Sequence, residues 1–112
     1  MDVSVVIPTY NRKPILQKCL YALENQKLNN LVNSYEIIVV DDGSSDGTNS
    51  WINKNSKKLP HVVLYEQKHG GPALGRNLGV MKSKSDIIIF IDSDLVVVDT
   101  FVISHVKKLS LA

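Results

Sequence analysis

The sequence has little that would suit a disulfide-bonded, nucleic-acid-binding or membrane-spanning protein. Cys19 is its only cysteine, so no disulfide can form within one chain. Its 13 lysines and arginines are nearly balanced by 11 aspartates and glutamates, and this net charge of +2 is too small for a nucleic-acid-binding surface. The longest apolar runs, residues 87–91 and 95–98, are far too short to span a bilayer. No basic leader precedes the apolar run at residues 3–7, so we expect no signal peptide and a cytoplasmic location.

What the sequence does contain is a regular alternation of strand and helix patterns. Four short, mostly β-branched runs predict strands at residues 3–7, 36–40, 61–66 and 87–91. Most are apolar at consecutive positions, which is typical of parallel strands that are covered on both faces. Apolar residues recur at helical spacing over residues 15–23, 51–52, 74–81 and 101–109. The chain therefore predicts one Rossmann-like α/β domain, with a mostly parallel sheet of about four strands and helices on both faces.

Polar residues follow each predicted strand, and in such sheets ligands bind beyond the carboxyl ends of the strands. After the first strand come Pro8, Thr9, Tyr10, Asn11 and Arg12. Thr9 and Asn11 can hydrogen-bond a base or a ribose, and Tyr10 offers a flat face for stacking. The alternative interpretation is a strand end followed by a helix cap.

The second strand is followed by two adjacent aspartates, Asp41 and Asp42, and by a glycine-containing turn. Carboxylates at the end of a buried strand are costly without partners. One of them can accept the imide N–H of uracil or contribute to a metal site. Gly43 and Gly47 allow positive φ in a tight turn. An ordinary turn with a helix cap at Ser45 or Asp46 is the alternative, but it leaves Asp41 unexplained.

The third strand is followed by His69, Gly70 and Gly71, and then by a helix that Pro72 opens. Glycines before a helix N-terminus can bring backbone amides close to a phosphate, and the helix dipole adds to that attraction. Arg76, about one turn into the helix, can reach back to a diphosphate or a uracil oxygen. A tight turn with a surface arginine is the alternative interpretation.

The fourth strand ends in an acidic pair, Asp92 and Asp94, separated by Ser93. Two carboxylates one residue apart can bind a single divalent cation. Oxygen ligands beside a phosphate-bearing ligand favour Mg²⁺ or Mn²⁺ over zinc. The sequence therefore predicts a metal site at Asp92 and Asp94, and the family resemblance given below implies that Asp92 and Ser93 also lie beside the nucleotide.

Taken together, these segments resemble the family-2 glycosyltransferases of the GT-A fold. The matching residues are 5–12, 36–48, 70–71, 75–79 and 90–94, so the resemblance covers nearly the whole chain. It implies an inverting enzyme that transfers a sugar from a nucleoside-diphosphate sugar, UDP more than GDP, to the hydroxyl of a glycan, lipid or protein acceptor. Residues 1–112 would be a truncated N-terminal portion of such a domain, supplying donor and metal binding.

The resemblance also assigns expected roles around the nucleoside. Pro8 and Thr9 would line its pocket, and either Asp41 or Asp42 would bind the base. His69 stands where the family often has asparagine.

The remaining roles that the resemblance implies concern the diphosphate, the metal and the base catalyst. Arg76 would lie near uracil or the diphosphate, Asp92 near the ribose and the metal, and Asp94 would be the principal metal ligand. The family's general base lies well downstream of the acidic pair, so we expect it beyond Ala112 and assign no catalytic residue here. We therefore expect weak or absent sugar transfer by these 112 residues alone, and self-association through uncovered apolar surface.

Two other classes of protein share parts of this pattern. The segment at Asp92 and Asp94 resembles the nucleophile motif of haloacid-dehalogenase-like phosphatases, in which the first carboxylate attacks phosphate. That class expects the motif near the start of a domain. A non-catalytic nucleotide-binding module, or a receiver-like signalling domain, has a similar length and architecture. A receiver would carry its acidic pair after the first strand, where this chain has Pro8 and Thr9.

Overall fold

The computed structural model describes residues 1–110, and residues 111–112 at the end of the predicted domain lie outside this range. Strands and helices alternate along the whole of it, as the sequence predicts. The elements are β1 (Asp2–Thr9), α1 (Lys13–Glu24), β2 (Ser34–Asp41), α2 (Thr48–Lys54), β3 (Val62–Glu66), α3 (Pro72–Lys82), β4 (Ile87–Phe90) and α4 (Phe101–Ser110). None of the helices within residues 1–110 is long and apolar enough to cross a membrane.

The four strands form one parallel sheet in the order β3-β2-β1-β4, which confirms the predicted α/β architecture. Thr9 pairs with Asp41, and Asp41 pairs with Glu66, so the carboxyl ends of three strands are level. The chain order reverses between β1 and β4, and a parallel sheet opens a crevice at such a switch point. Within residues 1–110, β4 pairs only with β1, so its other edge has no strand partner.

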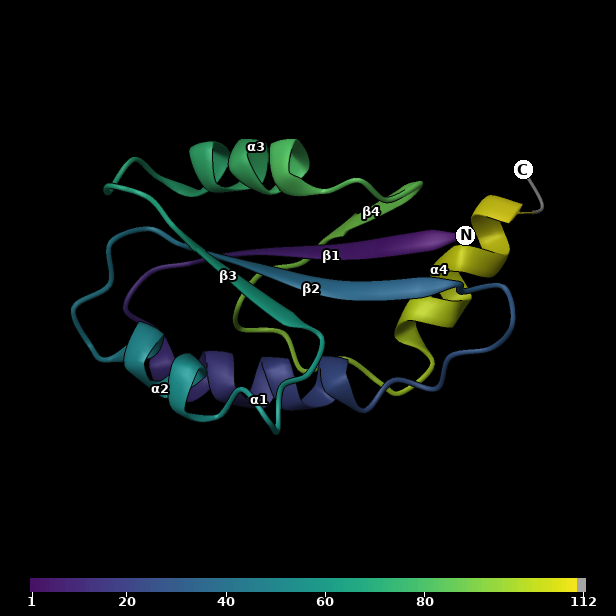
Figure 1. Cartoon of the computed structure of the whole chain (residues 1–112), viewed down its shortest axis with the longest axis horizontal. Coiled ribbons are helices and arrows are strands. Elements are labelled where there is room, and N and C mark those ends of the chain that lie inside the picture. The colour runs from purple at the N-terminus through teal and green to yellow at the C-terminus, as the bar shows by residue number, and fades with distance from the viewer. Residues whose placement is uncertain (111–112) are drawn as a thin grey trace.

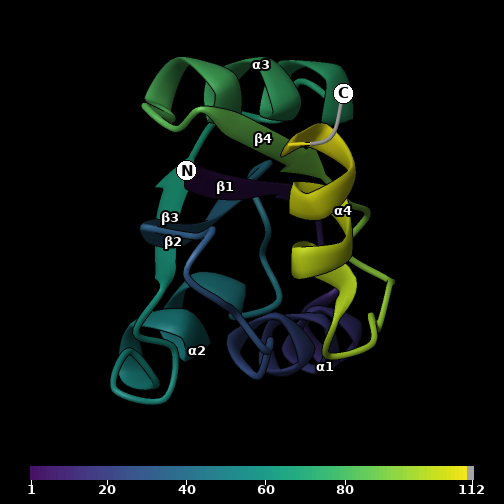
Figure 2. The ribbon, with the colours of Figure 1, turned by 90° about the vertical axis from the view of Figure 1, so that its right-hand side faces the viewer.

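Helices cover both faces of the sheet, as predicted, but unequally. Figures 1 and 2 show α3 alone on one face and α1, α2 and α4 on the other. Successive residues of a strand point to opposite faces. Val5 and Ile7 of β1 therefore lie in the larger core with α1 and α4, whereas Val6 lies in a smaller cluster with Leu78 of α3. All three β1 side chains are fully buried.

Of the apolar stripe predicted on α3 at Leu74, Leu78 and Met81, only Leu78 packs against the sheet, in the smaller cluster. Leu74 and Met81 are 54% and 79% exposed, and the buried positions of the helix are Gly75 and Gly79. A methyl group added at Gly79 would lie 2.3 Å from a methyl carbon of Val6. The glycines let the backbone of α3 approach the sheet closely, so the contact face consists of small residues together with Leu78.

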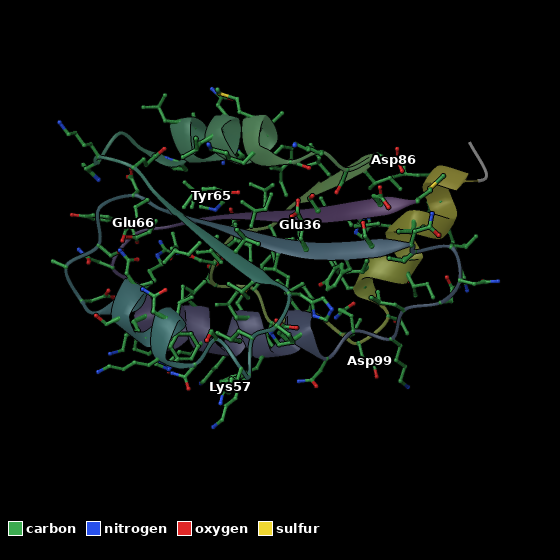
Figure 3. All side chains as sticks on the ribbon, in the orientation of Figure 1. Glu36, Lys57, Tyr65, Glu66, Asp86 and Asp99 are labelled. Carbon is green, nitrogen blue, oxygen red and sulfur yellow. The ribbon has the colours of Figure 1, made fainter. Side chains whose placement is uncertain are left out.

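The outer strand β3 contacts α3 through a tyrosine side chain. The Tyr65 side chain lies between β3 and α3 (Figure 3), and the ammonium group of Lys82 lies 5.4 Å from its ring centre. Glu66 lies at the left of Figure 3, beside the carboxyl ends of the strands, whereas Glu36 and Asp86 lie toward the opposite end of the sheet. The predicted binding residues belong to the loops at the Glu66 end.

The starts of α1 and α2 are joined by one carboxylate. Asp46 accepts hydrogen bonds from the Lys13 amide and from the amide and hydroxyl of Thr48. Burial opposes its ionisation, but these hydrogen bonds outweigh the burial and lower the pKa of Asp46 below its ordinary value. The N-cap residue of α2 is Gly47, at φ 86°. The cap was predicted at Ser45 or Asp46, and it is Asp46, one residue before Gly47, whose side chain accepts the Thr48 amide.

Candidate functional site

A cavity of about 420 Å³ opens at the carboxyl ends of β1 and β4, at the switch point of the sheet. Residues from the loops after β1, β2 and β4 and from the start of α3 meet there. Its lining consists of Pro8, Thr9, Tyr10, Arg12, Asp42, Pro72, Asp92, Ser93 and Asp94. Segments that lie more than 80 residues apart in the sequence thus form one concave surface, because the parallel register brings the strand ends together.

Thr9, which lines this cavity, carries a buried polar atom without a partner. The residue is 4% exposed, and its hydroxyl oxygen has no hydrogen-bond partner among residues 1–110. A buried hydroxyl without a partner is costly, and native proteins rarely tolerate one without a functional reason. A polar ligand atom in the cavity would supply the missing partner.

Asn11 shapes the cavity without lining it. Its φ of 49° is unusual for a residue other than glycine, and its amide oxygen accepts a hydrogen bond from the Ser45 amide. Its own backbone amide donates to the Ser44 hydroxyl. Asn11 therefore joins the loop after β1 to the loop after β2, and the direct contact with nucleotide that we predicted for it stays a prediction.

The two adjacent aspartates have different environments. Asp41 is 1% exposed, and both of its carboxylate oxygens contact Ser44, one accepting from the Ser44 amide at 3.0 Å and the other from its hydroxyl. Asp41 does not line the cavity, whereas Asp42 does. The geometry therefore favours Asp42 for contact with a ligand and gives Asp41 the task of holding the turn.

The Asp42 carboxylate is held by the loop after β3. One oxygen accepts from the Gln67 side chain at 2.8 Å and from the Gly70 amide at 2.7 Å, and the other accepts from the Gly71 amide at 3.0 Å. The Gln67 hydrogen bond contributes most to lowering the pKa of Asp42 below its ordinary value. These amides, which we expected beside a phosphate, donate to Asp42, so the carboxylate itself is the anion at the N-terminus of α3.

His69 completes the surroundings of Asp42. Its Nδ1 atom lies 2.9 Å from Asp42 Oδ2 and 3.3 Å from the Asp42 carbonyl oxygen. The centre of its ring lies 4.4 Å from that of Tyr10, with the two rings tilted by 39°. The His69 side chain is 65% exposed. The other groups around Asp42 are backbone amides and the partly buried Gln67 side chain, so His69 has the most room to move.

Arg76 lies on α3 one turn after Pro72, and residues four apart share a face of a helix. Pro72 lines the cavity, and Arg76 does not. The guanidinium group of Arg76 forms no ion pair or hydrogen bond within residues 1–110. A long cationic side chain placed this way is available to an anionic ligand.

The acidic pair after β4 lines the cavity as predicted, with Ser93 buried between two exposed carboxylates. Arg12 lies 3.9 Å from Asp94, in an exposed ion pair of the kind that contributes little stability. No cluster of three potential metal-binding side chains is present in the part of the chain that the structure describes. A Mg²⁺ or Mn²⁺ ion often takes only one or two carboxylates and completes its shell with substrate phosphates and water, and Asp92 and Asp94 fit that arrangement.

The structure thus brings seven predicted residues into one cavity, and it leaves Asn11, Asp41, Gly70 and Arg76 outside its lining. Their roles toward a ligand remain predictions. Three residues that the sequence did not predict for the site contribute to it: Arg12, Pro72 and Gln67. Arg12 lies in a segment that carries the family resemblance, and Pro72 directly follows another such segment. Gln67 had no signal, because only the fold places its side chain on Asp42.

Comparison with known proteins points to one family. Residues 4–110 match the profile described as glycosyl transferase family 2. A poly(ribitol-phosphate) beta-glucosyltransferase of Bacillus spizizenii is 40% identical over 96 residues, which cover 84% of this chain and 15% of the relative. The chain therefore spans only a small part of the length of this curated relative.

Solved structures agree in fold. Residues 1–349 of TarS from Staphylococcus aureus, crystallised with UDP-GlcNAc, superimpose with a TM-score of 0.85 at 26% identity, covering 99% of this chain and 32% of that one. The mannosyltransferase PcManGT from Pyrobaculum calidifontis, in complex with GDP-Man and Mn²⁺, gives a TM-score of 0.86 at 27% identity. This match covers 96% of this chain and 32% of that one.

Proposed function

Because the chain belongs to glycosyltransferase family 2, we propose that its cavity binds the nucleoside diphosphate of a sugar donor together with a divalent metal ion. The whole enzyme would transfer the sugar, with inversion, to an acceptor hydroxyl. The observation that carries this proposal is the meeting of Thr9, Asp42 and the Asp92–Asp94 pair on one cavity. Family membership and the position of Asp92 after the fourth strand disfavour a dehalogenase-like phosphatase, whose motif opens its domain.

In this proposal the base lies against Tyr10, and its ring N–H donates to Asp42. The tyrosine ring is 44% exposed and lines the cavity, so it offers a stacking face. Asp42 is held ionised by its hydrogen bonds, and an ionised carboxylate accepts strongly from a base N–H. The unpaired Thr9 hydroxyl would bind a polar atom of the nucleoside. A uracil imide suits this acceptor, so we propose UDP before GDP.

The diphosphate then lies between the acidic pair and the cationic side chains. Asp92 and Asp94 would hold a Mn²⁺ or Mg²⁺ ion, which supplies stabilisation of the negative charge that grows on the departing diphosphate. Arg12 pairs with Asp94 at 3.9 Å and is close enough to contact the same ligand, and Arg76 has no ionic partner within residues 1–110. Together these groups would neutralise a diphosphate in a cavity that is otherwise acidic.

Calorimetric titration of the chain with UDP, with and without Mn²⁺, tests the proposal directly. We expect Mn²⁺ to tighten UDP binding by about ten-fold or more, because the ion joins the carboxylates to the diphosphate. The Asp94→Asn variant should lose this dependence on metal. Asp99→Asn is the matched control, since Asp99 is an exposed aspartate whose partner is Lys27 at 3.3 Å and it lies outside the cavity.

Two results would contradict the proposal. One is an absence of UDP binding at millimolar concentrations in the presence of Mn²⁺. The other is metal-dependent binding that the Asp94→Asn and Asp99→Asn variants retain equally. Tighter binding of GDP than of UDP would leave the site intact but reverse the choice of base.

A further inference from the structure

His69 makes the two contacts that the proposed function assigns to the nucleotide base. Its planar ring lies against Tyr10, with 4.4 Å between ring centres, and its Nδ1 atom lies 2.9 Å from Asp42 Oδ2. A pyrimidine in this place would stack on Tyr10 and point a ring N–H at Asp42. Both contacts cannot be made by the imidazole and by a base at the same time.

The acceptor capacity of Asp42 explains why the two would compete. A carboxylate offers about four lone-pair positions. Three receive hydrogen bonds from Gln67, Gly70 and Gly71. The imidazole of His69 lies against the remaining position on Oδ2, at 2.9 Å. An incoming base N–H therefore needs a position that the protein already covers.

Of the four groups around Asp42, only His69 can leave at small cost. Gly70 and Gly71 act through backbone amides at the start of α3, and Gln67 also reaches the Gly71 carbonyl oxygen at 3.4 Å. The His69 side chain is 65% exposed and can rotate into solvent. Holding this exposed side chain in one geometry costs conformational entropy, so the net gain from its contact with Asp42 is small.

We propose that the His69 imidazole, which lies beside the cavity against two of its lining residues, Tyr10 and Asp42, occupies the base position in the absence of ligand and must move off both before a nucleotide with a ring N–H binds. The inference rests on the proposed function, because it takes the cavity to be a nucleotide site. His69 then lowers nucleotide affinity. In the absence of the sugar donor, it contacts the Asp42 carboxylate and the Tyr10 ring.

The His69→Ala variant provides the test, with UDP and CDP as probes in calorimetry at constant Mn²⁺. We expect UDP to bind about two- to five-fold more tightly to the variant than to the natural chain, as suits the loss of one weak competing contact. CDP carries no proton on the corresponding ring nitrogen, so its affinity should change less than that of UDP. A gain in affinity is an effect that damage to the structure would not produce.

His105→Ala is the matched control, because His105 packs its ring against Phe101 on α4, with 4.6 Å between ring centres, and lies outside the cavity. Circular dichroism establishes that both variants are folded. Unchanged or weaker UDP binding by a folded His69→Ala chain would overturn the role of His69 and leave the nucleotide site standing. An equal gain for UDP and CDP would also overturn it. Absence of nucleotide binding by every chain would overturn the proposed function as well.

Discussion

Thr9 shows how a single residue can be unfavourable for stability and favourable for binding. Its hydroxyl is buried at the end of β1 and lacks a partner within residues 1–110. Desolvating a hydroxyl without replacing its hydrogen bonds costs free energy in the folded chain. The same atom is ready to bind a ligand without first breaking an internal hydrogen bond. Binding sites often carry such local costs, which the rest of the fold offsets.

Replacing Thr9 with valine should therefore separate stability from binding. Thr9→Val keeps the shape of the side chain and removes the unpaired oxygen, so we expect the free energy of unfolding to rise by about 1 kcal/mol. The affinity for UDP should fall by about three- to ten-fold. Urea unfolding and calorimetry with Mn²⁺ and UDP measure the two effects.

Thr48→Val is the control for this prediction, because the Thr48 hydroxyl is equally buried but donates to Asp46. That variant should lose about 1 kcal/mol of stability and bind UDP as the natural chain does. A Thr9→Val chain that is less stable than the natural one would show that the Thr9 hydroxyl has a partner in solution.

At the scale of the element, α3 depends on close approach to the sheet. Gly75 and Gly79 face Pro8 and Val6, and a methyl group at Gly79 would lie 2.3 Å from one Val6 methyl and 3.1 Å from the other. Val6 is fully buried and cannot move aside freely. Because Gly75 and Gly79 carry no side chain, the helix can lie this close to the sheet. In that position Pro72 lines the cavity, and the Gly70 and Gly71 amides reach Asp42.

The variant Gly79→Ala tests this account. Alanine favours a helix over glycine by about 1 kcal/mol, but overpacking of a filled core costs about 1–3 kcal/mol. We expect the free energy of unfolding in urea to fall by up to about 2 kcal/mol in total. On the same helix, Val80→Ala changes a 43% exposed side chain and should alter stability by about 0.5 kcal/mol or less. A Gly79→Ala chain more stable than the natural one would mean that α3 does not rest on Val6.

At the scale of the whole molecule, the β4 side of the sheet is open. This edge has no strand partner within residues 1–110, and Phe90 on it is 48% exposed. Val96 and Val98 in the following loop are 64% and 69% exposed. An unpaired edge with apolar side chains promotes association between chains.

Self-association of the isolated chain is therefore expected to depend on this edge. Light scattering at millimolar concentration should give a mass above that of the monomer, and Phe90→Glu should lower it towards the monomer value, because edge charges oppose pairing. Ile15→Glu introduces the same charge at a 45% exposed residue of α1, outside the unpaired strand edge, and should leave association unchanged. A natural chain that is monomeric under these conditions would contradict the prediction.

The reactivity of the buried Cys19 thiol measures unfolding of the whole molecule. It is fully buried in the larger core, and burial, with a smaller contribution from the charge of Asp94, raises the pKa of its thiol to about 12. At pH 8 the native thiol is then about a thousand-fold less ionised than one of ordinary pKa, so thiol reagents should modify it only when the chain unfolds.

Labelling with Ellman's reagent at pH 8 measures this. Native protein should react slowly, at a rate that urea increases in step with global unfolding, and fully unfolded protein should react completely. Ser104→Cys places a second thiol at an exposed position of α4 and should add one rapidly reacting group. Rapid modification of Cys19 in native protein would reveal local opening of α1 from the core.

Local sequence was sufficient to determine the order of strands and helices, the α/β class and the loops that carry the site. Strand runs and helical spacing express burial, which follows from the hydrophobic effect and from backbone geometry within a few residues. The acidic pair at Asp92 and Asp94 and the turn at Gly43 and Gly47 were visible in the same way. The family followed from four such segments in a fixed order, and residues 4–110 match its profile.

Tertiary structure alone decided which side chains from different segments contact one another. Only the pairing of the strands shows that Asp41 is occupied by Ser44, that Asp42 faces the cavity, and that Gln67 and His69 meet Asp42 from another loop. The buried face of α3 was likewise decided by the space above Val6, which Gly79 fits, and not by Leu74 and Met81. A hydrogen bond or a steric contact between distant residues depends on their separation in space, which sequence spacing does not contain.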